Sequence, residues 1–330
     1  MEPTPAPPSD AGPPPTPWHP LLRAGLFLAV YVLLQIAVVR ALSLPAFLLG
    51  ERWFRAGGFA SSNEIFLLAI ALSAPPTVGA TWLFVRFADG RTLASLGARW
   101  PVGGRRAALR QLVTVPLGTL AFLAGWLALL LVLPAPLAEV RYAGAYRQPP
   151  AWWPFPPWML LALLGLGFLL QAGLEEWVLR GYIYHALEDG WRPLTAALVS
   201  SLLFALLHGA NPEVSLLALF NVLLAGMVLA ALVERSGSLW SATLAHATWN
   251  FSVACLLSLP VSGVRMFHLL DFSLSGDERL TGGAFGPEAS VLLTLLGLPL
   301  AAALWWRLWR NGPSAPEDVE QEPSPGKPMV

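Results

Sequence analysis

The chain alternates long apolar segments with short polar ones. The apolar segments lie near residues 22–39, 64–85, 111–133, 157–187, 194–211, 214–233, 238–260 and 288–309. As a helix, each is long enough to cross the hydrocarbon layer of a bilayer, which is about 30 Å thick. Because lipid offers no water to bond backbone N–H and C=O groups, such segments are expected to be α-helices. The pattern therefore predicts an all-α, polytopic membrane protein with about eight transmembrane helices.

The predicted helices divide the chain into five regions. These are a disordered Pro-rich tail at 1–20, transmembrane helices 1–3 within 21–140, a core of helices 4–7 at 155–260, helix 8 at 285–311, and a disordered tail at 312–330. The segment 86–110 between helices 2 and 3 holds six arginines. Since basic loops stay in the cytoplasm, this segment is expected there, and alternation of the spans places both termini on the same side.

Composition supports a membrane protein and excludes other classes. Apolar residues make up 55% of the chain and charged residues 12%, against about 25% charged in soluble domains. The 20 basic and 20 acidic side chains cancel, so no nucleic-acid partner is expected. The single cysteine, Cys255, allows no intramolecular disulfide. One lysine beside 19 arginines, with abundant Ala, Leu, Gly and Pro, indicates a GC-rich bacterial source. We therefore expect a multi-pass protein of the bacterial cytoplasmic membrane, in contact with the bilayer and of undetermined oligomeric state.

Polar side chains inside the predicted spans are few, and such residues are costly and usually functional. The fourth span contains Glu175, Glu176 and Arg180, the fifth contains Phe204 and His208, and the seventh contains His246 and Asn250. Glu176 and Arg180 are four residues apart and can pair on one helix face. Glu175 is turned by about 100° from Glu176 and is expected to face a different neighbour.

Helix lengths place some of these residues at one depth. A short turn near residues 188–192 joins the fourth and fifth helices, so Glu175 and His208 each lie about 22–24 Å from it. An antiparallel pair would therefore hold them level, in the cytoplasmic half of the membrane. His246 lies only about eight residues into its span and reaches that level only if its helix starts deeper. The spacing predicts an active site among helices 4, 5 and 7.

These side chains can carry out hydrolysis. A carboxylate can act as general base on a water molecule. His208, His246 and Asn250 can bind a metal such as zinc that makes the water acidic, or they can donate hydrogen bonds to an oxyanion without a metal. Two other classes stay open. A transporter would show paired half-helices, which are not visible, and a non-catalytic scaffold would use the same side chains to tie helices together.

The three motifs together resemble the CAAX-prenyl-endopeptidase and bacteriocin-processing (CPBP, ABI) family of intramembrane metalloproteases. The matching motifs are Glu175-Glu176-Trp-Val-Leu-Arg180, Phe204-Ala-Leu-Leu-His208 and His246-Ala-Thr-Trp-Asn250, in this order within residues 155–255. The resemblance implies that Glu175 is the catalytic base, that Glu176 and Arg180 support it, and that His208, His246 and Asn250 hold the water, metal or oxyanion. It also implies a membrane-bound protein or peptide as substrate. A non-catalytic scaffold or bacteriocin-immunity protein of the same fold is the alternative.

Overall fold

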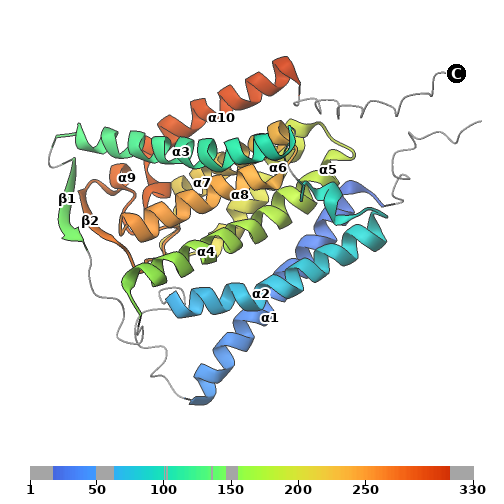
Figure 1. Ribbon diagram of the computed structural model, residues 1–330, viewed down its shortest axis with the longest axis horizontal. Helices are drawn as coiled ribbons and strands as arrows, with labels where there is room; N and C mark the ends of the chain where they lie inside the picture. Colours follow the sequence, from blue (N-terminus) through green and yellow to red (C-terminus); the bar gives the residue numbers. More distant parts are fainter. Residues whose placement is uncertain are drawn as a thin grey trace, which may run out of the picture.

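The computed structural model describes residues 18–49, 63–99, 101, 103–134, 137–145 and 155–312, so the two predicted tails lie almost entirely outside the described residues. The long helices are α1 (Pro20–Leu49), α2 (Asn63–Leu83), α3 (Gly104–Leu131), α4 (Pro157–Glu176), α6 (Pro193–Leu207), α7 (Leu216–Ser236), α8 (Leu239–Phe251) and α10 (Val291–Asn311). They form an elongated bundle (Figure 1). Within the described ranges, seven helical segments are long and apolar enough to cross a membrane. The predicted all-α, polytopic fold is therefore confirmed.

The segment predicted as the seventh span is the exception among the predicted helices. Helix α8 continues as the π-helix η6 (Ser252–Leu256), but it is not one of the seven segments that meet the length and hydropathy requirement. It packs against α3, α4 and α7, and a helix surrounded by other helices need not be apolar on every face. Helix α1 begins and α10 ends at the same end of the bundle (Figure 1).

The fourth predicted span is one continuous helical rod. It consists of α4, the π-helix η4 (Trp177–Tyr184) and the short helix α5 (His185–Glu188). Helix α6 begins at Pro193, where proline is well suited to the first helical turn. The predicted turn near residues 188–192 is therefore present, and it reverses the chain so that α6 packs against η4.

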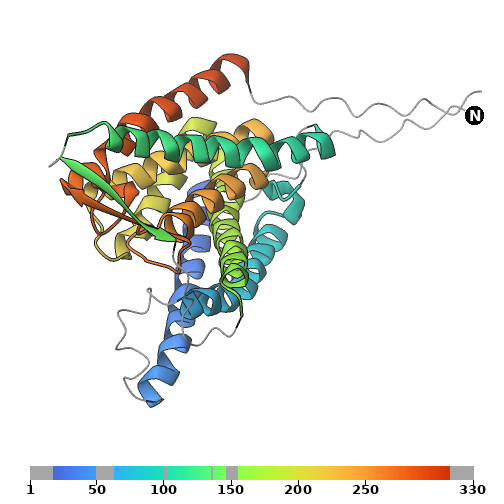
Figure 2. The same cartoon turned by 60° about the vertical axis from the view of Figure 1, so that its left-hand side comes forward.

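A small antiparallel sheet lies at one end of the bundle, at the left of Figure 2, beside the last turns of α3. It pairs β1 (Ala138–Ala145) with β2 (Leu270–Gly276), with a register shift between Tyr142 and Gly144. The apolar pattern predicts no strand here, because each strand is too short to stand out from the polar connections. The remaining short elements are η2 (Phe84–Ala88), η3 (Leu93–Leu96), η5 (His208–Ala210), α9 (Glu278–Thr281) and η7 (Pro287–Ala289).

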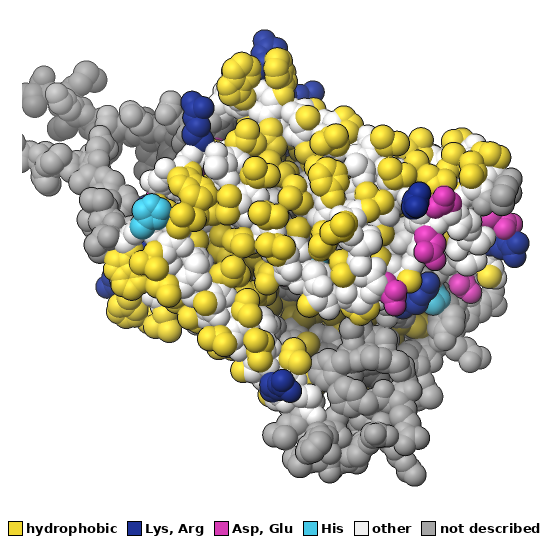
Figure 3. All heavy atoms as spheres, turned by 180° about the vertical axis from the view of Figure 1, so that it is seen from behind, with side chains coloured by type: hydrophobic (Ala, Val, Ile, Leu, Met, Phe, Trp, Pro, Cys, Tyr) yellow, Lys and Arg dark blue, Asp and Glu magenta, His cyan; other side chains and the backbone are white. Residues whose placement is uncertain are grey.

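The outer surface of the bundle has the distribution of apolar and charged side chains expected of a protein in a bilayer. Figure 3 shows one flank that is largely hydrophobic, with the charged side chains gathered towards the two ends of the molecule. Large apolar side chains are exposed on the outer faces of the long helices, including Leu33, Leu112, Leu117, Leu202 and Leu295. Exposure of many leucines on helices long enough to span lipid is expected where the solvent is hydrocarbon.

A buried ion-pair network joins α1 to the ends of two other helical rods. Arg23 is 1% exposed and pairs with two carboxylates. One is Asp89, directly after η2, and the other is Asp189, directly after α5, at 2.7 Å. Arg91 completes the network by pairing with Asp189 at 2.8 Å. Because a buried charge without a partner is strongly unfavourable, this network fixes the start of α1 against the rod that carries the two glutamates.

We predict that Arg23→Met lowers the thermal midpoint of the detergent-solubilised protein, because it leaves Asp89 buried without its partner. Breaking a buried pair costs about 3–5 kcal/mol. The matched control is Arg141→Met, which breaks the exposed pair of Arg141 with Glu139 and should leave the midpoint nearly unchanged. Equal midpoints for both variants would contradict the structural role of Arg23.

Candidate active site

Glu176 is the buried centre of the candidate site. Its side chain and that of Arg180 are both 0% exposed, and Arg180 Nη1 donates to Glu176 Oε1 at 3.0 Å. His246 Nδ1 lies 2.9 Å from the same oxygen. A carboxylate oxygen accepts, so His246 carries a proton on Nδ1 and its Nε2 is left to face elsewhere. Glu176 therefore fixes the orientation of the His246 ring.

Glu175 faces the other side of the same ring. It is 25% exposed, and its Oε2 lies 3.9 Å from His246 Nε2. As expected, the two glutamates bond different partners, Glu175 with Gln171 and Glu176 with Arg180 and His246, but both lie beside the His246 ring. The physical reason is that the imidazole of His246 is wide enough to present one nitrogen to each carboxylate.

The chain after the two glutamates is a π-helix, which no spacing argument predicts. Element η4 starts directly after Glu176, and π-helical turns are rare and frequent at functional sites. Every residue from Val178 to Tyr184 is buried, and His185 Nδ1 bonds to the carbonyl of Arg180 at 2.7 Å. The arrangement holds the Arg180 guanidinium inside the bundle, within reach of Glu176.

Phe204 connects the motif residues by packing. The Arg180 guanidinium lies 4.4 Å from the Phe204 ring centroid, a cation–π contact. The rings of His208 and His246 meet Phe204 edge-to-face at 4.5 and 5.7 Å. Close approach of α7 completes this packing, because a Cβ at Gly226 would lie 2.9 Å from Arg180 Nη2.

His208 ends α6 with its ring fixed by the backbone. Its Nδ1 lies 2.9 Å from the carbonyl oxygen of Phe204. Since a carbonyl only accepts hydrogen bonds, Nδ1 is the protonated nitrogen and Nε2 is available to a ligand. His208 and His246 therefore resemble each other, because each uses Nδ1 on a protein acceptor.

Gln171 is a site residue that the sequence analysis missed. Its Nε2 donates to Glu175 Oε1, and its Oε1 accepts from Asn250 Nδ2 at 3.1 Å. The amide thus links Asn250 to Glu175, and it leaves Glu175 Oε2 free of this contact. The available signal was a single polar residue, one helical turn before Glu175, in an otherwise apolar run.

The depth of His246 is explained by where α8 begins. Leu239 N donates to the carbonyl of Gly97 at 3.0 Å, and Gly181 packs against the Leu239 side chain, 3.2 Å from the position of a Cβ. Helix α8 therefore starts level with Gly181, well inside the rod that ends at Glu188. At about 1.5 Å per residue, Glu175 and His246 both lie roughly 9–11 Å from that level. His246 thus reaches the level of Glu175, because its helix starts deeper in the bundle, as the sequence analysis required.

Comparison with known families agrees with the motifs. Residues 156–252 match the family model described as type II CAAX prenyl endopeptidase Rce1-like. The resemblance is confirmed. This Rce1-like segment covers less than half of the chain, runs from α4 to the start of η6 and contains every motif residue. A search of curated proteins finds no match to the chain. The similarity to this endopeptidase family is therefore carried by residues 156–252.

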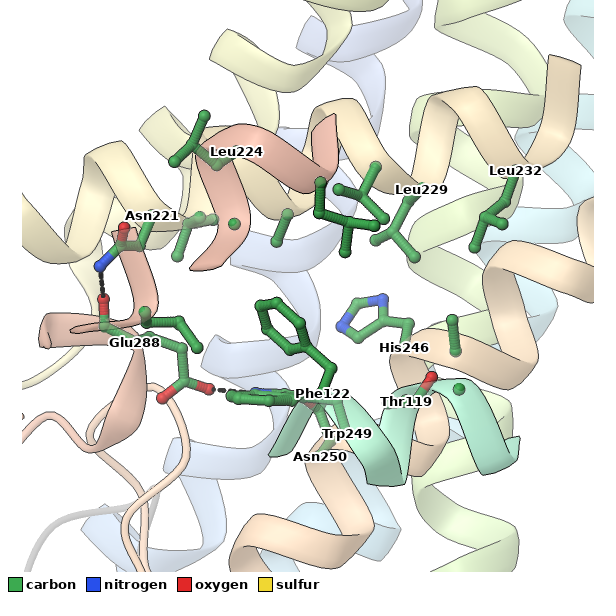
Figure 4. Close-up of a pocket in the computed structure, with 18 of the residues that line it drawn as sticks. Thr119, Phe122, Asn221, Leu224, Leu229, Leu232, His246, Trp249, Asn250 and Glu288 are labelled. Atoms are coloured by element: carbon green, nitrogen blue, oxygen red, sulfur yellow. Dashed lines mark hydrogen bonds between the residues drawn. The ribbon is translucent and has the colours of Figure 1, made fainter. Parts of the chain in front are cut away.

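Two separate cavities border the Rce1-like segment. One, of about 740 Å³, is lined by Glu175 and Gln171 and lies towards α1 and α2. The other, of about 360 Å³, is lined by His246 and lies among α3, α7, α8 and α10; Figure 4 shows the His246 ring pointing into it. Phe204, His208 and Asn250 line both cavities. The carboxylate and the imidazole are thus reached from opposite sides.

Among the residues described, no group of three or more His, Cys, Asp and Glu side chains is placed to hold a metal, whereas catalytic zinc normally has three protein ligands. His208 and His246, two of the predicted ligands, form no such group with Glu175; the third, Asn250, donates its Nδ2 to Gln171 and keeps its carbonyl oxygen. No step proposed below runs through a metal.

Glu288 is a further buried acidic residue, and it contacts the Rce1-like segment. It lies in η7 and is 7% exposed. Its Oε1 accepts from Trp249 Nε1 at 2.9 Å, and Figure 4 shows its carboxylate beside the indole. Burial raises the pKa of Glu288 to about 7, because the charged form loses hydration. The carboxyl therefore titrates near neutral pH while it holds Trp249, the residue before Asn250.

We predict that the protein becomes less stable as the pH rises from about 4.5 to about 7. A carboxyl whose pKa is raised by folding is protonated in both states at low pH, and its penalty grows until the folded state also ionises. Glu288→Gln should remove part of this decrease, so that the melting temperatures of the two proteins converge at pH 5 and differ by a few degrees at pH 8. The measurement is thermal unfolding in detergent across this pH range. Parallel curves for the two proteins would show that Glu288 does not titrate there.

Proposed function

We propose that the protein is an intramembrane endopeptidase that hydrolyses a peptide bond of a membrane-associated protein or peptide. One observation carries the proposal. Within the described residues, Glu175 Oε2 is buried without a hydrogen-bond partner, and it lies 3.9 Å from His246 Nε2. This separation is too long for a direct hydrogen bond and suits one water molecule in contact with both groups.

In the proposed reaction Glu175 is the general base. Its Oε2 takes a proton from the water as the oxygen attacks the scissile carbonyl carbon, and the same carboxyl then gives that proton to the nitrogen as the C–N bond breaks. Gln171 supports this role because its amide holds Oε1 and leaves Oε2 to the water. The products are a carboxylate and an amine, and no further reactant is needed.

The remaining motif residues are suited to the charge that develops on the carbonyl oxygen. His208 and His246 each leave Nε2 available, and Asn250 keeps a second amide hydrogen beyond the one given to Gln171. A protonated imidazole or an amide can donate to an oxyanion. Glu176 with Arg180 positions the His246 ring, as carboxylates commonly do for functional imidazoles. We therefore propose a metal-free water as the nucleophile.

We place this site in the cytoplasmic half of the bacterial cytoplasmic membrane, with both termini cytoplasmic. The support is the arginine-rich segment 86–110, which the positive-inside rule assigns to the cytoplasm. The structure puts Arg91 beside Asp189, at the α5–α6 turn. Glu175 lies about 20 Å along the rod from this turn.

We predict that Glu175→Gln lowers the rate of cleavage of membrane-anchored peptides by about 10²–10⁴-fold, because general-base catalysis is lost. His246→Ala should also inactivate, and the unmutated preparation should contain less than one zinc per chain and keep its activity after chelation. The assay uses purified full-length protein in detergent or vesicles. Stoichiometric zinc with loss of activity on chelation would contradict the metal-free mechanism.

The same variants distinguish the alternative, a non-catalytic scaffold or bacteriocin-immunity protein. Such a protein keeps the fold and does not need a general base. Absence of cleavage by the unmutated protein, together with rescue of a null strain by Glu175→Gln, would support the scaffold and overturn the peptidase.

We predict a smaller effect for Gln171→Leu, a drop in kcat of roughly tenfold with little change in KM. The reason is that the variant removes one hydrogen bond that orients Glu175 and leaves the general base in place. Gln171→Glu serves as the matched control of nearly equal shape, because it can still accept from Asn250 but repels Glu175. Both variants should therefore have a lower kcat. A lower kcat in Gln171→Glu alone would show that the amide is not needed to orient Glu175.

A further inference from the structure

A basic cavity lies where α7 and α10 end, away from the candidate site. It has a volume of about 490 Å³ and is lined by Arg235 of α7 and by Trp306, Arg307, Arg310 and Asn311 of α10. All three arginines are exposed. Three guanidinium groups from two helices thus surround one hollow.

The charges of these arginines are not balanced by the protein around them. Within the described residues, none of the three has a hydrogen-bond or ion-pair partner, and Arg310 has only an aromatic contact, 5.7 Å from the Trp306 ring centroid. In contrast, Arg23 and Arg180 are each paired with a carboxylate. The neighbouring carboxylate of Glu234 does not pair with these arginines, because it accepts the hydroxyl hydrogen of Tyr184 at 2.6 Å.

The two helices are held at a fixed separation near this cavity. Trp305 Nε1 donates to the carbonyl of Met227 at 3.0 Å and so ties α10 to α7. The guanidinium groups therefore converge on a framework that exists without a ligand, which lowers the cost of ordering a site.

We expect the cavity to lie at the depth of lipid headgroups. Both α7 and α10 are among the seven segments suited to cross a membrane, and the arginines lie in or next to their last turns. Trp306 and Trp309 are 55% and 79% exposed, and tryptophan is enriched at the boundary between hydrocarbon and water. Basic residues at helix C-termini also favour the helix dipole, but that effect does not require residues of two helices to surround a hollow.

We propose that the cavity formed by Arg235, Arg307 and Arg310 binds the phosphate group of an anionic phospholipid. Guanidinium groups bind phosphate oxygens through paired, charge-assisted hydrogen bonds. The exposed rings of Trp306 and Trp309 would rest against the acyl chains below the headgroup. Occupancy would pin the C-terminal ends of α7 and α10 to one leaflet. This site is independent of the proposed hydrolysis, since it includes no motif residue.

The test measures lipid binding by the full-length protein. Native mass spectrometry counts bound lipid while phosphatidylglycerol, phosphatidylcholine or inorganic phosphate is added to the detergent-solubilised protein. The unmutated chain should retain one phosphatidylglycerol in preference to phosphatidylcholine. The triple variant R235Q/R307Q/R310Q should bind it on the order of a hundredfold more weakly. The triple variant R40Q/R141Q/R279Q loses the same charge elsewhere and should bind like the unmutated chain.

Several results would overturn the proposal. Equal retention of phosphatidylglycerol by both triple variants would show that overall charge, not this cavity, attracts the lipid. Displacement of the lipid by millimolar inorganic phosphate would show a site for free phosphate. The sequence after Gly312 contains Glu317, Asp318, Glu320 and Glu322, and lipid binding that appears only when these four are neutralised would show that the acidic tail occupies the cavity. A matching melting curve for the two triple variants shows that the comparison is between folded proteins.

Discussion

The buried carboxylate of Glu176 is the constraint on which the rest of the site depends. It is 0% exposed and accepts from Arg180 of its own rod and from His246 of α8. Removing any one of the three leaves a buried charge or donor without a partner, which costs far more than a surface contact. The ring of Phe204 and the missing side chain of Gly226 follow from it, since both accommodate the Arg180 guanidinium.

The same constraint explains how two adjacent glutamates take different roles. Glu176 is fully buried and its Oε1 bonds both Arg180 and His246, whereas Glu175 is 25% exposed and borders a cavity. His246 couples them, because fixing Nδ1 on one carboxylate directs Nε2 towards the other. A rigid support and the proposed general base are thus built from one residue type at neighbouring positions, and only the surroundings differ.

The sequence was sufficient for the features that depend on period and length. Apolar segments long enough for a bilayer predicted the helices, and four-residue spacing predicted the Glu176–Arg180 pair. The sequence was insufficient for features of the structure that depend on tertiary contacts. The π-helix after Glu176, the early start of α8 against Gly97 and the sheet of β1 with β2 have no periodic signal. Gln171 was visible as a lone amide one turn before Glu175 on α4, but its contact with Asn250 of α8 forms only in the folded bundle.

The two cavities impose a condition on any substrate of the proposed peptidase. Glu175 borders one cavity and His246 the other, and the residues shared by both form the wall between them. A scissile bond in reach of both groups must lie at that wall. A transmembrane helix, about 10 Å across, has its carbonyl groups bonded within the helix. Hydrolysis therefore requires a segment that is already extended or that unwinds locally, so local helix stability near the cut, more than the apolar character of the segment, should decide which chains are cleaved.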